Sequence, residues 1–171
     1  MTPKKLNLGS GNSPRREGYL NVDIVPGENV DLVFDLSKKL PFGAESIDEI
    51  YSHHLFEHLI NYEEVLDDWY RVLTPGGRLE INTPNMDGIC HDWVDLEIHP
   101  YVQLGPFSSP EAYKRHLIKM AIGESGGYMR HQSLFWPDEI KRVLETHRFS
   151  VDDIKVESQC AGPAMKVLAH K

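Results

Sequence analysis

Short apolar runs alternate with helix-forming stretches along most of the chain, and this alternation constrains the fold more than any other feature. Strands are predicted over 5–8, 20–24, 30–34, 47–51, 78–82, 149–156 and 164–169. Strands that alternate with helices fold into a mostly parallel sheet. The 171 residues are enough for one domain with a sizeable core. The sequence therefore predicts a single α/β domain.

Three helices have clear start signals. Asn61 with Glu64 has capping-box spacing, and the helix that follows ends at Pro75-Gly76. Pro110 follows Ser109 at the first position of a second helix, and Pro137 opens a third. Between the predicted strand 78–82 and Pro137, residues 86–130 lose this rhythm and gain glycine, proline, histidine and aromatic residues. We expect this segment to be an insertion that covers the active site.

Glycines and acids follow three of the predicted strands. The first strand runs into Gly9-Ser10-Gly11, the second ends at Asp23, and the third ends at Asp35. Glycines let the backbone approach a ligand closely, and an acid at a strand end can accept hydrogen bonds from both hydroxyls of a ribose. Carboxyl ends of parallel strands lie at one edge of a sheet, so the pattern predicts a site for an adenosine-bearing cofactor.

Several segments, in this order, resemble class I S-adenosylmethionine-dependent methyltransferases. Residues 6–11 (LNLGSG) resemble the first motif of that family, and residues 71–79 (RVLTPGGRL) resemble its late motif. Further similar segments are Pro14-Arg15 with 18–23, 40–42 with 46–50, and 54–59. The resemblance is strong over residues 4–85 and weak over residues 131–171.

This resemblance implies a Rossmann-like three-layer sandwich around a mostly parallel seven-stranded sheet with its last strand antiparallel. The implied cofactor is S-adenosylmethionine. By the same resemblance, Gly9, Ser10 and Gly11 pass its methionine end, Asp23 binds the ribose with Ile24 against the adenine, Asp35 and Leu36 fix the adenine edge, and Ser52, His53 and His54 lie near the sulfonium.

The chain departs from the usual family pattern in its short connections. The stretch from Gly11 to Asp23 is too short for a crossover helix plus a strand. The third predicted strand also reaches the fourth with little room for a helix. We therefore expect one face of the sheet to be thinly covered.

Two histidines are candidates for a catalytic base. Methyl transfer to a hydroxyl needs a proton acceptor, and histidine suits that role near neutral pH. We expect His131, at the end of the irregular segment, to serve first and His54 second. The strand before His54 is not followed by the Asn/Asp-Pro-Pro-aromatic sequence of enzymes that methylate nucleobase amines. We expect a small polar or sugar-like acceptor, methylated at oxygen.

Three other interpretations match parts of the sequence. A nicotinamide-dependent oxidoreductase would have a third glycine where Pro14 stands, and its acid would come later than Asp23. Residues 54–58 (HLFEH) match an inverted zinc-protease motif, in which His54 and His58 would share a helix face. No third ligand is identifiable by spacing, so we expect no metal. A cofactor-binding protein without catalysis stays open.

Charge and hydropathy limit the partners. The formal net charge is −8, with 26 acidic and 18 basic residues, which disfavours a nucleic-acid substrate. No apolar run reaches the ~20 residues that span a bilayer, and the N-terminus lacks the apolar region of a signal peptide. We expect a cytoplasmic protein that acts on a small molecule without a membrane, with a homodimer left open.

Overall fold

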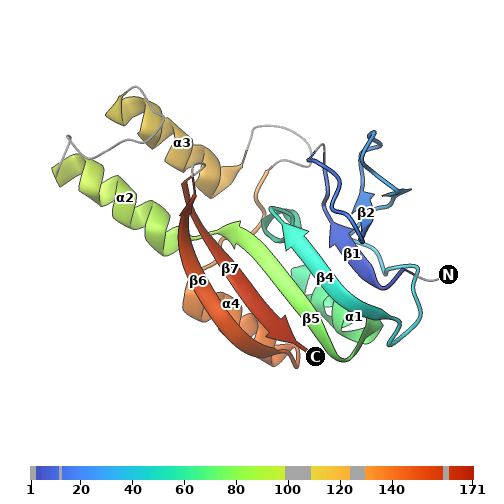
Figure 1. Ribbon diagram of the computed structural model, residues 1–171. Coiled ribbons are helices and arrows are strands. Elements are labelled where there is room, and N and C mark those ends of the chain that lie inside the picture. Colours follow the sequence, from blue (N-terminus) through green and yellow to red (C-terminus); the bar gives the residue numbers. More distant parts are fainter. Residues whose placement is uncertain (1–2, 12, 99–108, 124–129, 160–161) are drawn as a thin grey trace.

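One seven-stranded sheet organises the molecule (Figure 1). The computed structural model describes residues 3–11, 13–98, 109–123, 130–159 and 162–171. The strands are β1 (Lys5–Leu8), β2 (Leu20–Asp23), β3 (Leu32–Val33), β4 (Ile47–His53), β5 (Leu73–Pro84), β6 (Ser150–Gln159) and β7 (Gly162–His170). The helices are the 3-10 helix η1 (Phe56–His58), α1 (Tyr62–Val72), α2 (Met86–Ile98), α3 (Pro110–Ile122) and α4 (Pro137–Thr146).

The strand order is β3-β2-β1-β4-β5-β7-β6. Strands β1 to β5 pair in parallel, and β7 is antiparallel to both β5 and β6. The predicted Rossmann-like fold and its antiparallel last strand are therefore confirmed. The chain reverses its direction of winding between β1 and β4, which is where ligands bind in open α/β sheets.

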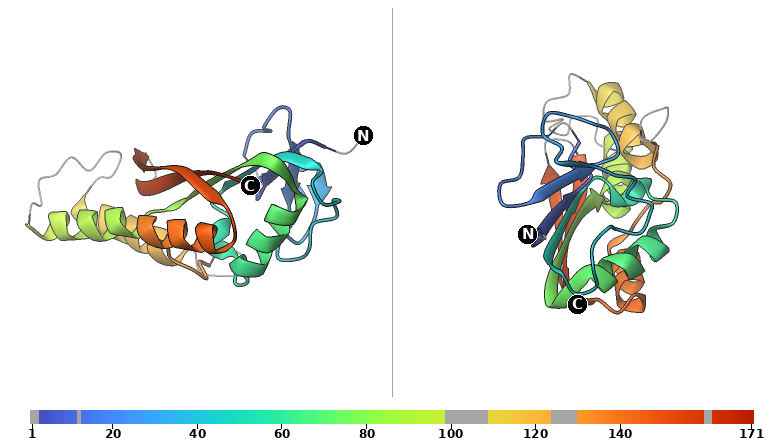
Figure 2. Two further views of the ribbon diagram at one scale, coloured as in Figure 1. Left: turned by 90° about the horizontal axis from the view of Figure 1, so that it is seen from below. Right: turned by 90° about the vertical axis from the view of Figure 1, so that its right-hand side faces the viewer.

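Helices α1 and α4 lie on the same face of the sheet (Figure 2). Trp69 of α1 and Ile140 of α4 are fully buried in one core together with Leu6 and Ile50 of the neighbouring strands β1 and β4. Each such side chain contributes about 1.5–3 kcal/mol through burial of its apolar surface. Helix packing on this face therefore anchors β1 and β4 at their shared edge.

The opposite face of the sheet is polar. Tyr51 and His53 alternate along β4 with the buried Ile50 and Ser52, so they point to this second face. The guanidinium of Arg16, from the link between β1 and β2, lies 3.8 Å from the centre of the Tyr51 ring. That link forms no helix over its described residues. This face of the sheet is therefore thinly covered, as expected, and its polar side chains allow it to contact water.

Helices α2 and α3 extend beyond the sheet from its β5–β7 side (Figure 1). Met86 and Ile89 of α2 form a small second core with Leu117 and Met120 of α3. Helix α3 begins at Pro110 as predicted, and the Ser109 hydroxyl caps it by accepting a hydrogen bond from Ala112 N. Helix α2 was not predicted. Residues 99–108 and 124–129 of the expected cover lie outside the described residues, so its covering role stays a prediction.

One local expectation differs from the structure. The Asn61 side chain makes no cap bond, and its amide instead donates to Ser37 O and to Glu64 Oε2. The predicted capping box is therefore wrong in its hydrogen bonds, although α1 begins where expected.

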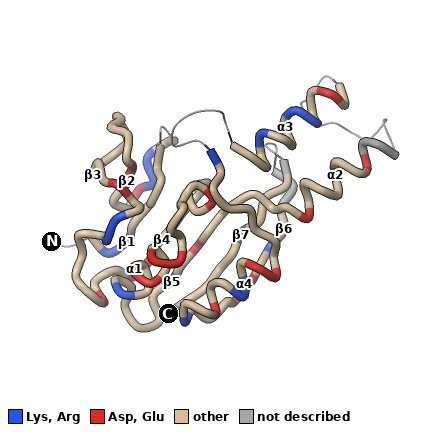
Figure 3. The backbone as a smooth tube through the Cα atoms, turned by 180° about the vertical axis from the view of Figure 1, so that it is seen from behind, with Lys and Arg blue, Asp and Glu red and all other residues tan. Residues whose placement is uncertain are grey.

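Basic and acidic residues are interspersed along the described backbone (Figure 3). Among the described residues, no helix has both the length and the apolar character needed to cross a bilayer.

Candidate functional site

The loop after β1 brings two glycines to the carboxyl edge of the sheet, each for a different reason. Gly9 has φ of +73°, and a Cβ there would lie 2.7 Å from the Cβ of Leu55. Gly11 has φ of +54°, yet a Cβ there would meet nothing within 4 Å. Gly9 therefore permits close packing, whereas Gly11 leaves open space that a ligand can enter.

Asp23 connects this loop to the end of β2. Its Oδ2 accepts a hydrogen bond from Gly11 N at 2.8 Å, and its Oδ1 accepts one from Val25 N at 2.9 Å. Each carboxylate oxygen can accept a second hydrogen bond. The side chain is half-buried and already fixed in place. The geometry suits the predicted role of Asp23 with the ribose hydroxyls.

The residues expected near the adenine differ in their surroundings. Asp35 Oδ1 accepts from the backbone N and the hydroxyl of Ser37, and these two bonds lower the pKa of the Asp35 carboxyl. Ile24 is half-buried, so part of its side chain is free to contact a ligand. Leu36 is only 4% exposed and packs into the main core. Its observed contacts are therefore structural.

The three residues at the end of β4 point in different directions. Ser52 is buried in the helix-covered face, and its hydroxyl has no hydrogen-bond partner among the described residues. His53 stacks on Tyr51 on the polar face and lines a cavity of about 300 Å³. The other residues that line this cavity are Asn7, Gly9, Ser10, Ser13, Pro14, Arg15, Arg16 and Tyr51.

His54 turns toward a buried carboxylate. It has φ of +50°, which is uncommon outside glycine although histidine, asparagine and aspartate adopt it more often than other residues. Its Nδ1 lies 2.9 Å from Oε1 of Glu57, and Glu57 is 1% exposed. The hydroxyl of Thr83, on β5, donates to the other oxygen of that carboxylate at 3.1 Å. The carboxylate thus holds the His54 ring in one orientation.

His131 reaches the same carboxylate from the far end of the irregular segment. Its Nε2 lies 4.0 Å from Oε1 of Glu57. Backbone bonds fix this approach, because Gln132 N and Ser133 N both donate to Glu57 O, at 2.7 and 3.1 Å. The ring of His58 lies beside the His131 ring, with 4.8 Å between their centres. The two predicted catalytic histidines therefore meet at one buried acid that sequence reasoning had not placed between them.

Burial sets the charge state of these groups. It lowers the pKa of His53, and the charge on His54 lowers it further. It also lowers the pKa of His131, against the opposing effect of Glu57. Burial alone would raise the pKa of the Glu57 carboxyl, but the hydrogen bond and charge of His54 hold it below its usual range. At neutral pH these shifts favour an ionised Glu57 carboxylate and neutral rings at His53 and His131.

The backbone of residues 54–58 does not have the helical geometry that the zinc-protease interpretation requires. Only Phe56–His58 forms a helix, and it is a single 3-10 turn. His54 lies before it with a left-handed backbone and donates to Glu57. His54 and His58 therefore do not share the face of an α-helix, as that motif requires. The sequence signal that could have found this site is Glu57 itself, the fourth of the five residues of that motif.

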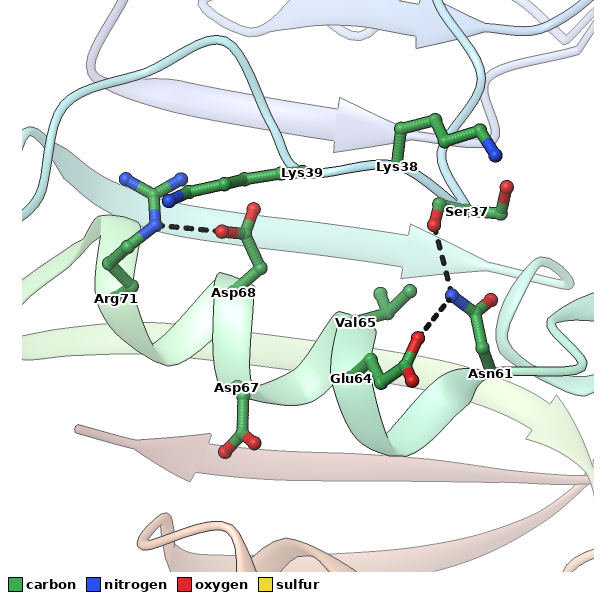
Figure 4. Close-up of a pocket in the computed structure, with 9 residues that line it drawn as sticks. All are labelled: Ser37, Lys38, Lys39, Asn61, Glu64, Val65, Asp67, Asp68 and Arg71. Atoms are coloured by element: carbon green, nitrogen blue, oxygen red, sulfur yellow. Dashed lines mark hydrogen bonds and ion pairs between the residues drawn. The ribbon is translucent and has the colours of Figure 1, made fainter.

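A second cavity, of about 360 Å³, lies along α1 (Figure 4). Its polar groups bind one another: Arg71 Nε donates to Asp68 Oδ1 at 2.7 Å, and the amide of Asn61 bridges Ser37 O and Glu64. None of the residues expected to contact the cofactor lines it. The lining residues are Ser37, Lys38, Lys39, Asn61, Glu64, Val65, Asp67, Asp68 and Arg71.

Part of the chain matches a known protein family and a curated relative. Residues 19–81 match the model of a family described as a methyltransferase domain. An uncharacterized 37.1 kDa protein of transposon Tn4556 from Streptomyces fradiae is 30% identical over 83 residues, or 48% of this chain. The match spans 21% of the length of that relative.

Solved structures share the whole fold. The 1,6-didemethyltoxoflavin-N1-methyltransferase of Burkholderia thailandensis, solved with S-adenosylhomocysteine bound, has a TM-score of 0.63 and 18% identity over 98% of this chain and 70% of its own. An S-adenosylmethionine-dependent methyltransferase of Mesorhizobium loti has a TM-score of 0.59 and 13% identity over 98% of this chain and 90% of its own. These similarities extend over the described strands and helices.

Proposed function

We propose that this chain, a class I S-adenosylmethionine-dependent methyltransferase by its family match and its fold, methylates a hydroxyl oxygen of a small polar or sugar-like molecule. The observation that carries the proposal is the His54–Glu57 pair at the carboxyl end of β4, where the strand order reverses. A histidine oriented by a carboxylate can act as a general base, and a hydroxyl that is methylated must lose a proton to such a base.

The residues at the carboxyl edge fit an adenosine-bearing cofactor. Open space lies beyond Gly11, and each oxygen of Asp23 keeps acceptor capacity for a ribose hydroxyl. S-adenosylmethionine supplies an electrophilic methyl group on a sulfonium, so the protein mainly aligns the acceptor and excludes water. Gly9, Ser10 and Gly11 would line its methionine end, and Asp35 with Ile24 its adenine.

The proton of the acceptor has one well-oriented destination. Because His54 Nδ1 donates to Glu57, its Nε2 keeps a free lone pair. Glu57 fixes the tautomer and stabilises the imidazolium that forms when Nε2 takes a proton. The geometry thus favours His54 over His131, the reverse of the order predicted from the sequence. His131 closes the site from the opposite side.

An assay of methyl-donor consumption tests the proposal. The full chain is incubated with S-adenosylmethionine and pools of small hydroxylated compounds, and release of S-adenosylhomocysteine is followed. We expect turnover with hydroxyl acceptors and none with the same compounds after their hydroxyls are blocked as methyl ethers. Turnover that persists with the blocked compounds would move the acceptor atom to nitrogen or carbon and contradict the oxygen assignment.

A further inference from the structure

Three potential metal ligands converge at the end of β4, and methyl transfer as described above leaves one of them, His58, without a role. Glu57, His58 and His131 each place one ligand atom within 4.8 Å of the other two. The carboxylate is 1% exposed, and the His131 side chain is 8% exposed. The carboxylate already accepts from His54 and Thr83, and a bound cation would stabilise its buried negative charge further.

We propose that Glu57, His58 and His131 bind one divalent transition-metal ion, with Zn²⁺ as the reference ion. Two imidazole nitrogens and one carboxylate oxygen are a donor set that Zn²⁺ uses in catalytic sites, where a fourth position stays open. The sequence expectation of no metal depended on a missing third ligand. His131 fills that place through the fold, because the chain from 130 to 133 is hydrogen-bonded onto η1.

The surroundings prepare two of the three side chains, His58 and Glu57, for a metal. Nδ1 of His58 lies 3.2 Å from the carbonyl oxygen of Arg130, so it donates there and leaves Nε2 free to bind an ion. Thr83 donates to the Glu57 carboxylate at 3.1 Å, and His54 donates at 2.9 Å. Metal-binding histidines and carboxylates are held in this way by outer hydrogen bonds, which fix the tautomer and the ring orientation.

The separations suit a site that closes on the ion. Bonds of 2.0–2.2 Å in tetrahedral geometry place ligand atoms about 3.3 Å apart. Glu57 Oε1 and His131 Nε2 are 4.0 Å apart, too far for a hydrogen bond between them. Closing on an ion needs an approach of about 0.7 Å for this pair and at most about 1.5 Å for any pair of the three ligand atoms, which lie within 4.8 Å of one another. The gap therefore has the size of an intervening ion.

The consequence for catalysis rests on the proposed function. An acceptor hydroxyl bound at the open position would lose its proton more readily, because a divalent ion stabilises the alkoxide. The proton goes to Nε2 of His54. The oxygen forms a bond to the methyl carbon while the carbon–sulfur bond breaks, and S-adenosylhomocysteine leaves. The acceptor class narrows to compounds whose hydroxyl can coordinate a cation.

Calorimetric titration with ZnCl₂ tests the site on full-length protein purified without a His tag and stripped with a chelator. We expect one equivalent to bind, and we expect His131→Ala and His58→Ala to weaken binding by at least 100-fold. His147→Ala is the matched control, because its ring pairs with Asp67 elsewhere on the surface. If His131→Ala fails to fold, as judged by circular dichroism, His58→Ala carries the test.

Two results would overturn the metal site: wild-type protein that binds no stoichiometric Zn²⁺, or cluster variants that bind it like His147→Ala. Calorimetry of the stripped protein with S-adenosylmethionine reads the cofactor site separately, so loss of the metal site would leave the methyltransferase assignment intact. Binding of Zn²⁺ without any metal effect on turnover would keep the site and remove its catalytic consequence.

Discussion

Nδ1 of His54 lies 2.9 Å from Oε1 of Glu57, a carboxylate with 1% of its surface exposed at the carboxyl end of the central strands. The two residues are close in sequence, but their arrangement depends on contacts from distant parts of the chain. Thr83 from β5 binds the same carboxylate, and the backbone at 132 and 133 binds the Glu57 carbonyl. A buried acid held from three directions keeps one imidazole nitrogen free for chemistry.

Replacement of His54 should remove catalysis without removing the cofactor. His54→Asn tolerates the left-handed backbone at this position but has no imidazole to accept a proton. We expect kcat to fall by roughly 100-fold or more, while the dissociation constant for S-adenosylmethionine changes little. The control is His147→Asn. A His54→Asn variant with wild-type kcat would show that the proton leaves by another route.

Asp23 should contribute strongly to cofactor affinity. Hydrogen bonds to a charged acceptor are worth about 1.5–3 kcal/mol each, and about 1.4 kcal/mol corresponds to tenfold in affinity. Asp23→Ala should therefore weaken binding of S-adenosylmethionine by more than 10-fold in calorimetry. Asp48→Ala, at an exposed acid near the other end of the sheet, should leave it unchanged. Equal affinities in folded Asp23→Ala and wild type would place the ribose elsewhere.

Gly9 and Gly18 offer a matched pair for stability. Both have positive φ, at +73° and +79°, but a Cβ at Gly9 would lie 2.7 Å from Leu55, whereas one at Gly18 meets nothing within 4 Å. The backbone term costs about 1–2 kcal/mol at either position. We expect urea denaturation to show a larger loss for Gly9→Ala, by at least about 1 kcal/mol. Equal losses would mean that the Leu55 contact relaxes at no cost.

Asp31 should make stability depend on acid. Its carboxylate accepts from Asn21 N at 2.8 Å, and this bond, the Asn21 side chain and Arg15 lower the pKa of Asp31 in the folded state. Because the folded pKa is below the unfolded one, the contribution is complete above the unfolded value of about 3.9 and is lost as pH falls through the folded pKa. Asp31→Asn should be less stable than wild type at pH 7.

The difference between Asp31→Asn and wild type should shrink as the pH falls below about 4, the unfolded pKa of an aspartate. Urea unfolding at a series of pH values measures it. Asp48→Asn, at an exposed acid, controls for the general effect of removing one negative charge. A difference between wild type and Asp31→Asn that stays constant over this range would contradict the role given to the carboxylate.

Local signals predicted much of the fold. Ser109 followed by Pro110 begins α3 as expected, and the glycines and Asp23 lie together at the strand ends. Such features depend on a few neighbouring residues and on strand direction. Helix α2 was not predicted because Gly88 interrupts its helical sequence pattern. The structure gives the reason for this glycine: a Cβ there would lie 2.5 Å from the Cβ of Pro163, so it permits close packing against the start of β7.

The reactive cluster could be predicted only in part. His54 and His131 were candidates separately, but their meeting at Glu57 depends on long-range hydrogen bonds that no local spacing reveals. Leu36 shows the converse: its place in the motif implies a ligand contact, while its side chain packs in the core, so that contact stays a prediction.

Calorimetric titration of the full chain with S-adenosylmethionine, S-adenosylhomocysteine and NAD tests the central claim most directly. The edge formed by Gly11 and Asp23 suits adenosine with a short amino-acid tail, and it lacks the third glycine of a dinucleotide fingerprint. We predict one equivalent of S-adenosylmethionine and of S-adenosylhomocysteine, and no binding of NAD. Binding of NAD with no heat from either sulfur compound would contradict the account.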